Sequence, residues 1–131
     1  MGLLERFRKK EEKTVVHTSR AMSDLEQFCG DDKQTYEALQ HTMFLDPRKI
    51  GTSMKDAAEN AKSFAKERNL ARARIWYDIA GGMAIYEGEV KKVIEFFSES
   101  QKISGLKYPI LVDVEKAVAK AQEYYKKHLK S

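Results

Sequence analysis

Residues 30–47, GDDKQTYEALQHTMFLDP, predict one amphipathic helix with a defined start and end. Gly30 suits the left-handed residue that closes a preceding helix, and Asp31 and Asp32 can accept hydrogen bonds from the free N–H groups of the next helix. Asp46-Pro47 ends the segment, because the residue before a proline is displaced from helical backbone angles. The stretch is therefore either an ordinary helix of a bundle or one unit of a repeating helical array.

The composition favours a single all-α domain. Of the 131 residues, 42% are hydrophobic and 34% are charged, so the chain can bury a modest core and does not have the composition of a disordered protein. Only two prolines and seven glycines occur, which permits long helices. We predict a charged amphipathic tail over residues 1–13 and one all-helical domain over residues 14–131.

Apolar residues recur at helical spacing in six segments. The segments begin near Thr18, Asp32, Ser53, Leu70, Val90 and either Pro109 or Asp113. Alanines dominate the apolar face of residues 53–68, which predicts a closely packed neighbour. Residues 70–86 are apolar over too broad a face for one-sided burial, so this helix is expected at the centre of the fold. The break between these two helices is expected near Arg68-Asn69, because asparagine tolerates left-handed backbone angles.

The helical segments are also similar to one another. Residues 54–70 align with residues 90–106, with lysines, glutamates and apolar residues at matching positions. This alignment divides the domain into antiparallel hairpins over residues 18–45, 53–86 and 89–128. The other arrangement pairs the helix of Trp76 with the helix that follows Gly88, since a helix in a stacked array contacts both of its neighbours.

Several motifs resemble the tetratricopeptide repeat, a helical hairpin of about 34 residues. The stretch from Gly30-Asp31 to Leu45-Asp46-Pro47 is similar to the second helix of that repeat. Residues 86–105 are similar as well, although they end in Ser-Gly instead of Asp-Pro, and residues 76–80 resemble the opening of the first helix. The glycine turns of the two stretches do not lie a whole number of repeats apart. An irregular bundle of five or six helices is therefore the alternative to a tetratricopeptide-like array.

The resemblance implies a protein-interaction or adaptor module that binds a peptide or a helix on its surface. Some members of the family clamp a terminal carboxylate with lysine and asparagine side chains of first helices. Lys55 and Asn60 have these residue types, and Arg72 and Trp76 complete the candidate peptide-binding set. Arg72 can lie against Trp76, four residues further along the same helix. The expected partner is another protein or peptide, and a second copy of the chain is a further candidate, because short arrays expose apolar ends.

The alternative function is binding to an anionic surface, either nucleic acid or acidic lipid. The formal net charge is +4, a small excess of basic over acidic residues. The basic residues gather at the two termini: Arg6, Arg8, Lys9, Lys10, Lys126, Lys127 and Lys130.

The sequence offers little for catalysis or metal binding. His17, His41 and His128 lie far apart, and Glu37 shares a helix face with His41 without a second motif of that kind. Cys29 precedes two aspartates that raise a thiol pKa, which favours a structural cysteine over a nucleophile. The glycine pair at 81–82 lies within a helical segment and indicates either close helix packing or a kink. We therefore expect neither an enzyme nor a metal or cofactor site.

The sequence predicts a cytoplasmic protein. Cys29 is the only cysteine, so no internal disulfide can form, which suits a reducing compartment. Charged residues interrupt the apolar residues near the start of the chain, which argues against a secretory signal. No stretch approaches the roughly 18 apolar residues of a membrane span.

Overall fold

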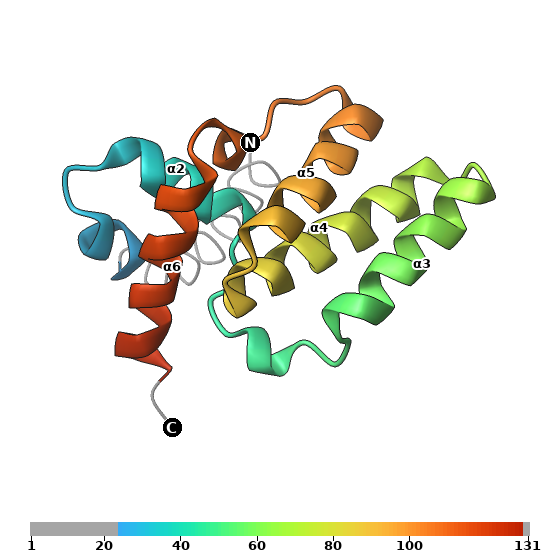
Figure 1. The fold of residues 1–131 in the computed structure, drawn as a ribbon. Coiled ribbons are helices and arrows are strands. Elements are labelled where there is room, and N and C mark those ends of the chain that lie inside the picture. The colour runs from blue at the N-terminus through green and yellow to red at the C-terminus, as the bar shows by residue number, and fades with distance from the viewer. Residues whose placement is uncertain (1–23, 130–131) are drawn as a thin grey trace, which may run out of the picture.

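The computed structural model describes residues 24–129 and shows an all-α fold, with no strand in that range (Figure 1). Residues 24–29 are helical at the start of the described chain. They precede five α-helices and two short 3-10 helices: α2 (Lys33–Thr42), η1 (Pro47–Lys49), α3 (Met54–Lys66), α4 (Leu70–Glu87), α5 (Val90–Ser104), η2 (Pro109–Val112) and α6 (Val114–His128). The predicted fold class is confirmed. The tail predicted for residues 1–13 lies outside the described residues.

Local side-chain chemistry fixes most helix ends. An N-cap side chain accepts a hydrogen bond from the N–H group three residues further on at the starts of α2, α3, α4 and α6, from Asp32, Ser53, Asn69 and Asp113. These contacts satisfy N–H groups that the helix itself leaves without a partner. A glycine with a positive φ angle closes a helical segment at Gly30, Gly88 and Gly105. The Gly30–Asp32 turn therefore works as the sequence predicts.

Two helix boundaries differ from the sequence prediction. α2 ends at Thr42, before the Asp-Pro pair, and residues 43–46 connect it to η1. The carbonyl of Phe44 in this connection accepts a hydrogen bond of 2.6 Å from the hydroxyl of Tyr125 on α6. This bond takes the place of the backbone hydrogen bond that the carbonyl would accept if α2 continued. Between α3 and α4 the left-handed residue is Arg68, with φ 60°, and not Asn69. Asn69 instead caps α4.

α3, α4 and α5 form an antiparallel row with α4 in the middle (Figure 1). α4 packs most extensively against both neighbours, so each of the two pairings considered from the sequence is present. The buried side chains of α3 are all alanines: Ala57, Ala58 and Ala61. Their small size lets α3 lie close to α4, as the alanine-rich face predicts.

The glycine pair of α4 accommodates two phenylalanine rings. A Cβ atom at Gly81 would lie 2.5 Å from Cζ of Phe97, whose side chain on α5 is fully buried. A Cβ atom at Gly82 would lie 2.4 Å from Cε2 of Phe44. Side chains therefore occupy the volume that any residue other than glycine would need, which confirms close helix packing as the role of this pair.

α6 and α2 occupy the other side of the molecule (Figure 1). The side-chain amide of Gln122 on α6 donates hydrogen bonds of 2.7 Å to the carbonyls of Ile85 and Tyr86, at the C-terminal end of α4. Lys116 on α6 forms an ion pair of 2.9 Å with Asp32, at the start of α2. α6 therefore stabilises the end of one helix and the beginning of another.

Candidate functional site

A groove lies between α3 and α5, where the two outer helices of the row flank α4. Its volume is about 340 Å³. It is lined by Met54, Lys55, Ala58, Glu59 and Lys62 of α3 and by Lys92, Glu95 and Phe96 of α5. A cleft between helices is a common position for a binding site.

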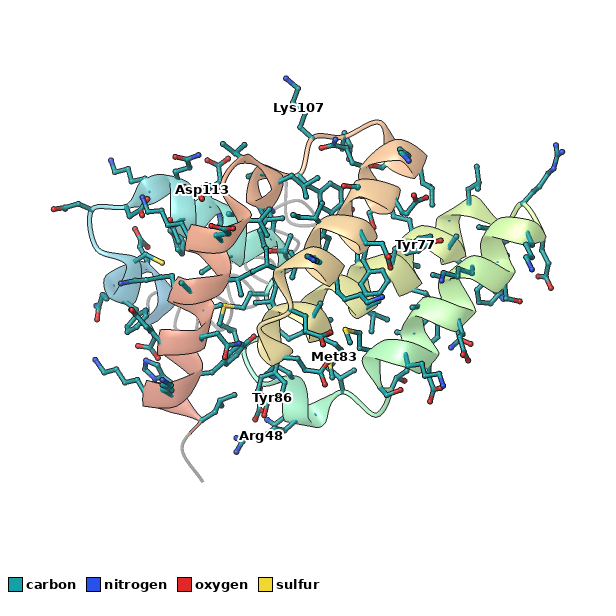
Figure 2. The ribbon with its side chains drawn as sticks, in the orientation of Figure 1. Arg48, Tyr77, Met83, Tyr86, Lys107 and Asp113 are labelled. Atoms are coloured by element: carbon teal, nitrogen blue, oxygen red, sulfur yellow. The ribbon has the colours of Figure 1, made fainter. Side chains whose placement is uncertain are left out.

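The floor of this α3–α5 groove is apolar. Ala58 and Phe96 are buried, and Met54 is partly buried against the core. Tyr77 of α4 packs on Phe96, with ring centroids 6.5 Å apart, and Figure 2 shows Tyr77 between the ribbons of α5 and α3. The floor is therefore a supported surface whose side chains are held in place from below.

The walls of the groove carry opposite charges in alternation. Lys55, Glu59 and Lys62 follow one another along α3, and all three are exposed. On α5, Lys92 lies 3.8 Å from Glu95 and also lies over the ring of Phe96, 5.9 Å from its centroid. A ligand in the groove would meet an apolar base between two polar rims, the arrangement that suits an amphipathic peptide.

The structure does not gather the predicted peptide-binding residues into one site. Lys55 lines the groove, whereas Asn60 is an exposed residue of α3 outside the lining. The Arg72 guanidinium lies over the ring of Phe64 on α3, 5.7 Å from its centroid, and not over Trp76 as the sequence spacing predicts. Trp76 is partly buried against the core. A tertiary contact between α3 and α4 has therefore replaced the contact expected within one helix.

One pair of groove residues stands out in the internal alignment. Aligning residues 54–70 with residues 90–106 equates Glu59 with Glu95. These two glutamates lie on opposite walls of the groove. Sequence similarity between the two segments thus marks helices that flank the same surface, although it does not show that an open groove separates them.

A second cleft of about 390 Å³ lies between α2, α4 and the loop before η2. It is lined by Glu37, His41, Arg74, Asp78, Leu106, Lys107, Tyr108 and Pro109. Lys107 extends away from the body of the molecule at its rim (Figure 2). Glu37 and His41 share a face of α2, as their spacing predicts.

Tyr108 organises the charges of this cleft. Its hydroxyl donates a hydrogen bond of 2.8 Å to Asp78 and accepts one of 3.1 Å from Nε of Arg74. Its backbone N–H donates to Gln101 over 3.0 Å, and its ring packs on Phe97 at 5.6 Å between centroids. Burial raises the pKa of the Tyr108 hydroxyl, which therefore stays protonated near neutral pH. We interpret these contacts as the ones that hold the segment before η2 against α4 and α5.

Sequence reasoning identified the pairing of Arg74 with Asp78 but missed Tyr108. Arg74 Nε lies 3.9 Å from Asp78 as an i,i+4 ion pair. Tyr108 lies about thirty residues further along the chain, and only the fold brings it to these side chains. Within residues 24–129 no group of three or more histidine, cysteine or acidic side chains is placed to hold a metal ion.

Some of the basic side chains near the C-terminal end pack against an aromatic ring. Lys127 lies 5.8 Å from the centroid of the Phe28 ring, and Lys120 lies 4.5 Å from it. Lys126 is exposed. The other predicted anion-binding residues lie outside the described part of the chain: Arg6, Arg8, Lys9, Lys10 and Lys130.

Cys29, which follows Phe28 in the chain, is a buried free cysteine. Burial is the main cause that raises its thiol pKa, with a smaller contribution from Asp32 that the Lys120 ammonium opposes. A thiol that remains protonated is a poor nucleophile, so Cys29 fits the structural role predicted from the sequence.

Comparison with protein-family models, with curated proteins and with solved structures found no match to this chain. Among the described helices, none combines the length and the apolar character needed to cross a bilayer.

Proposed function

We propose that this protein is an interaction module that binds a peptide or a helix of another protein in the α3–α5 groove. The observation that carries the proposal is a groove whose floor is apolar and whose two walls carry exposed charges. Ala58 and Phe96 are already buried, so the partly exposed Met54 supplies the apolar contact, and the charges at the rim supply orientation and specificity. The resemblance to tetratricopeptide repeats supports the same kind of function.

Binding to an anionic surface has less support from the described residues. Lys127 covers an aromatic ring and Lys116 is paired with Asp32, so part of the positive charge of α6 has a structural role. The single buried cysteine suits a reducing compartment, and we propose the cytoplasm as the location.

The test uses two matched substitutions. Glu95→Trp places a bulky ring in the groove, while Glu123→Trp makes the same change on α6. Both glutamates are exposed, and each pairs with a lysine three residues before it, at 3.8 Å for Glu95 and 3.7 Å for Glu123. The two variants therefore lose equivalent surface ion pairs, and only Glu95→Trp obstructs the groove.

Wild-type and variant proteins are used to capture partners from a lysate of the native organism, and the captured proteins are identified by mass spectrometry. We expect partners that bind wild type and Glu123→Trp but not Glu95→Trp, and whose capture changes little between low and moderate ionic strength. Equal capture by all three proteins would contradict docking in the groove. Capture that disappears steeply with added salt and ignores Glu95→Trp would favour the anionic-surface function.

A further inference from the structure

We propose that the partner in the α3–α5 groove is an amphipathic helix with two acidic residues seven positions apart, which pair with Lys55 and Lys62. This inference rests on the proposed function and adds the chemistry of the partner. It follows from a difference between the two walls: the charged side chains of α5 are paired with each other, whereas, within the described range, those of α3 are not.

The α3 wall carries charges that form no ion pair with other residues of the range 24–129. Among the described residues, no carboxylate lies within 4.0 Å of the ammonium group of Lys55 or Lys62. Glu59 lies between them in sequence and likewise forms no ion pair at that distance within the described part of the chain. The wall therefore presents positive, negative and positive charge in order, with a net charge of one positive unit.

The α5 wall is different because its charges are already paired. Lys92 is held between Glu95 and the ring of Phe96. A ligand that used either group would have to compete with that contact. Charge recognition in the groove is therefore expected on the α3 side.

The spacing of the two lysines favours a helical partner over an extended strand. Seven residues separate Lys55 from Lys62, which corresponds to about 10 Å along the helix axis. A partner helix that runs beside α3 repeats the same distance between its own residues seven apart, and both of these lie on one face. On a β-strand, residues of one face recur about 7 Å or 13 Å apart, and neither distance matches.

The experiment selects partners without assuming their identity. A displayed library of amphipathic helices with randomised flanking positions is selected against the full wild-type chain. Binders are then titrated by fluorescence anisotropy at low ionic strength against Glu95→Trp and two charge-reversed variants.

The two charge-reversed variants change the net charge of the protein equally. The first carries Lys55→Glu with Lys62→Glu. The second carries Lys33→Glu on α2 with Lys126→Glu on α6, two exposed lysines that do not line the groove. Neither of these control lysines forms an ion pair within 4.0 Å among the described residues. Thermal melts verify that each variant is folded.

We expect that the peptides whose binding is abolished by Glu95→Trp carry two acidic residues seven positions apart. Their affinity should fall about tenfold for the Lys55/Lys62 variant and remain unchanged for the Lys33/Lys126 control. Replacing the two acids of the peptide by lysine should restore binding to the Lys55/Lys62 variant. A central proline in the peptide should abolish binding, because it breaks a helix.

Other outcomes separate this inference from the proposed function. Some peptides could lose binding to the Glu95→Trp protein and yet carry no acidic pair, or still bind with the central proline. Such peptides would refute the acidic helix and leave groove docking intact. An equal loss of affinity in both charge-reversed variants would likewise refute pairing with Lys55 and Lys62, because it would reflect net charge alone. A concentration-dependent dimer of the chain alone that Glu95→Trp dissociates would instead assign the groove to a second copy. A selection that yields no binder sensitive to Glu95→Trp would refute both proposals.

Discussion

Replacing Gly81 by alanine tests the packing that holds the row of helices together. A Cβ atom at this position would lie 2.5, 2.6 and 2.7 Å from three atoms of the Phe97 ring. Real Cβ contacts are longer, so either the ring or the helix must move. Phe97 is fully buried and also packs on Tyr108, which leaves the ring little room to retreat.

Two opposing effects determine the size of the change. Inserting a methyl group into a packed core costs about 1–3 kcal/mol. Alanine in place of glycine inside a helix contributes about 1 kcal/mol in the opposite direction. We therefore expect Gly81→Ala to lower the free energy of unfolding by about 1 kcal/mol, with a melting temperature lower by roughly 3–5 °C. Urea and thermal unfolding, followed by circular dichroism, measure both quantities.

Two other glycines provide controls. Gly51 lies outside the helices, and a Cβ atom there would have no neighbour within 4 Å, so Gly51→Ala should change stability by less than about 0.5 kcal/mol. Gly82→Ala meets the ring of Phe44, which is only partly buried and can move, so a smaller loss than for Gly81→Ala is expected. Combining Gly81→Ala with Phe97→Leu should cost less than the sum of the two single changes. A Gly81→Ala protein as stable as wild type, or strict additivity with Phe97→Leu, would refute this account.

Three further predictions concern single polar groups. Tyr125→Phe removes the 2.6 Å hydrogen bond to the carbonyl of Phe44 and should lower stability by about 1–3 kcal/mol in urea unfolding. Burial raises the pKa of Tyr125 well above its ordinary value of 10.0. Because the unfolded chain releases this proton first, Tyr125 alone should lower stability by up to about 1.4 kcal/mol per pH unit above pH 10. Other tyrosines whose pKa is raised by burial add to the loss, so the Tyr125→Phe protein should lose stability less steeply than wild type. Equal slopes would contradict this. Hydrogen bonds from Lys116 and Thr35 lower the pKa of Asp32 to about 2. The contribution of Asp32 to folding stability should therefore be complete above pH 4 and be lost as the pH falls towards 2. An Asp32→Asn protein with the same acid-unfolding midpoint as wild type would contradict this. Ser100 Oγ is buried and has no hydrogen-bond partner of standard geometry among the described residues, although the hydroxyl acts on the nearby Tyr108 and lowers its pKa. Ser100→Ala should therefore be neutral or stabilising by up to about 1 kcal/mol, whereas a clear loss of melting temperature would reveal a hydrogen bond between Ser100 and Tyr108.

The helices of this protein could be predicted because their signals are local. Gly30 and Asp32 mark one boundary, and Ser53 and Gly88 mark others, through backbone angles and hydrogen bonds that span only a few residues. The broad apolar face of residues 70–86 likewise predicts the central position of α4, since a helix buried on several sides needs apolar residues on all of them.

The candidate site could be predicted only in part. Lys55 was selected by residue type and does line the groove, but Glu59, Lys62 and Phe96 were not identified. Which side chains share a groove depends on the distance and rotation between α3 and α5. These quantities are set by the alanines and glycines at which α4 lets its neighbours approach, and they involve residues far apart in the chain.

The sequence by itself determined where most of the helices begin and which face of each is apolar, because 3.6-residue periodicity and capping act within one or two turns. Only the tertiary structure decided that Arg72 lies over Phe64, that Tyr108 joins Arg74 and Asp78, and that an open groove remains between α3 and α5. The physical reason is that packing between distant segments depends on how side-chain volumes fit together, and the periodicity of a single helix contains no information about its neighbour.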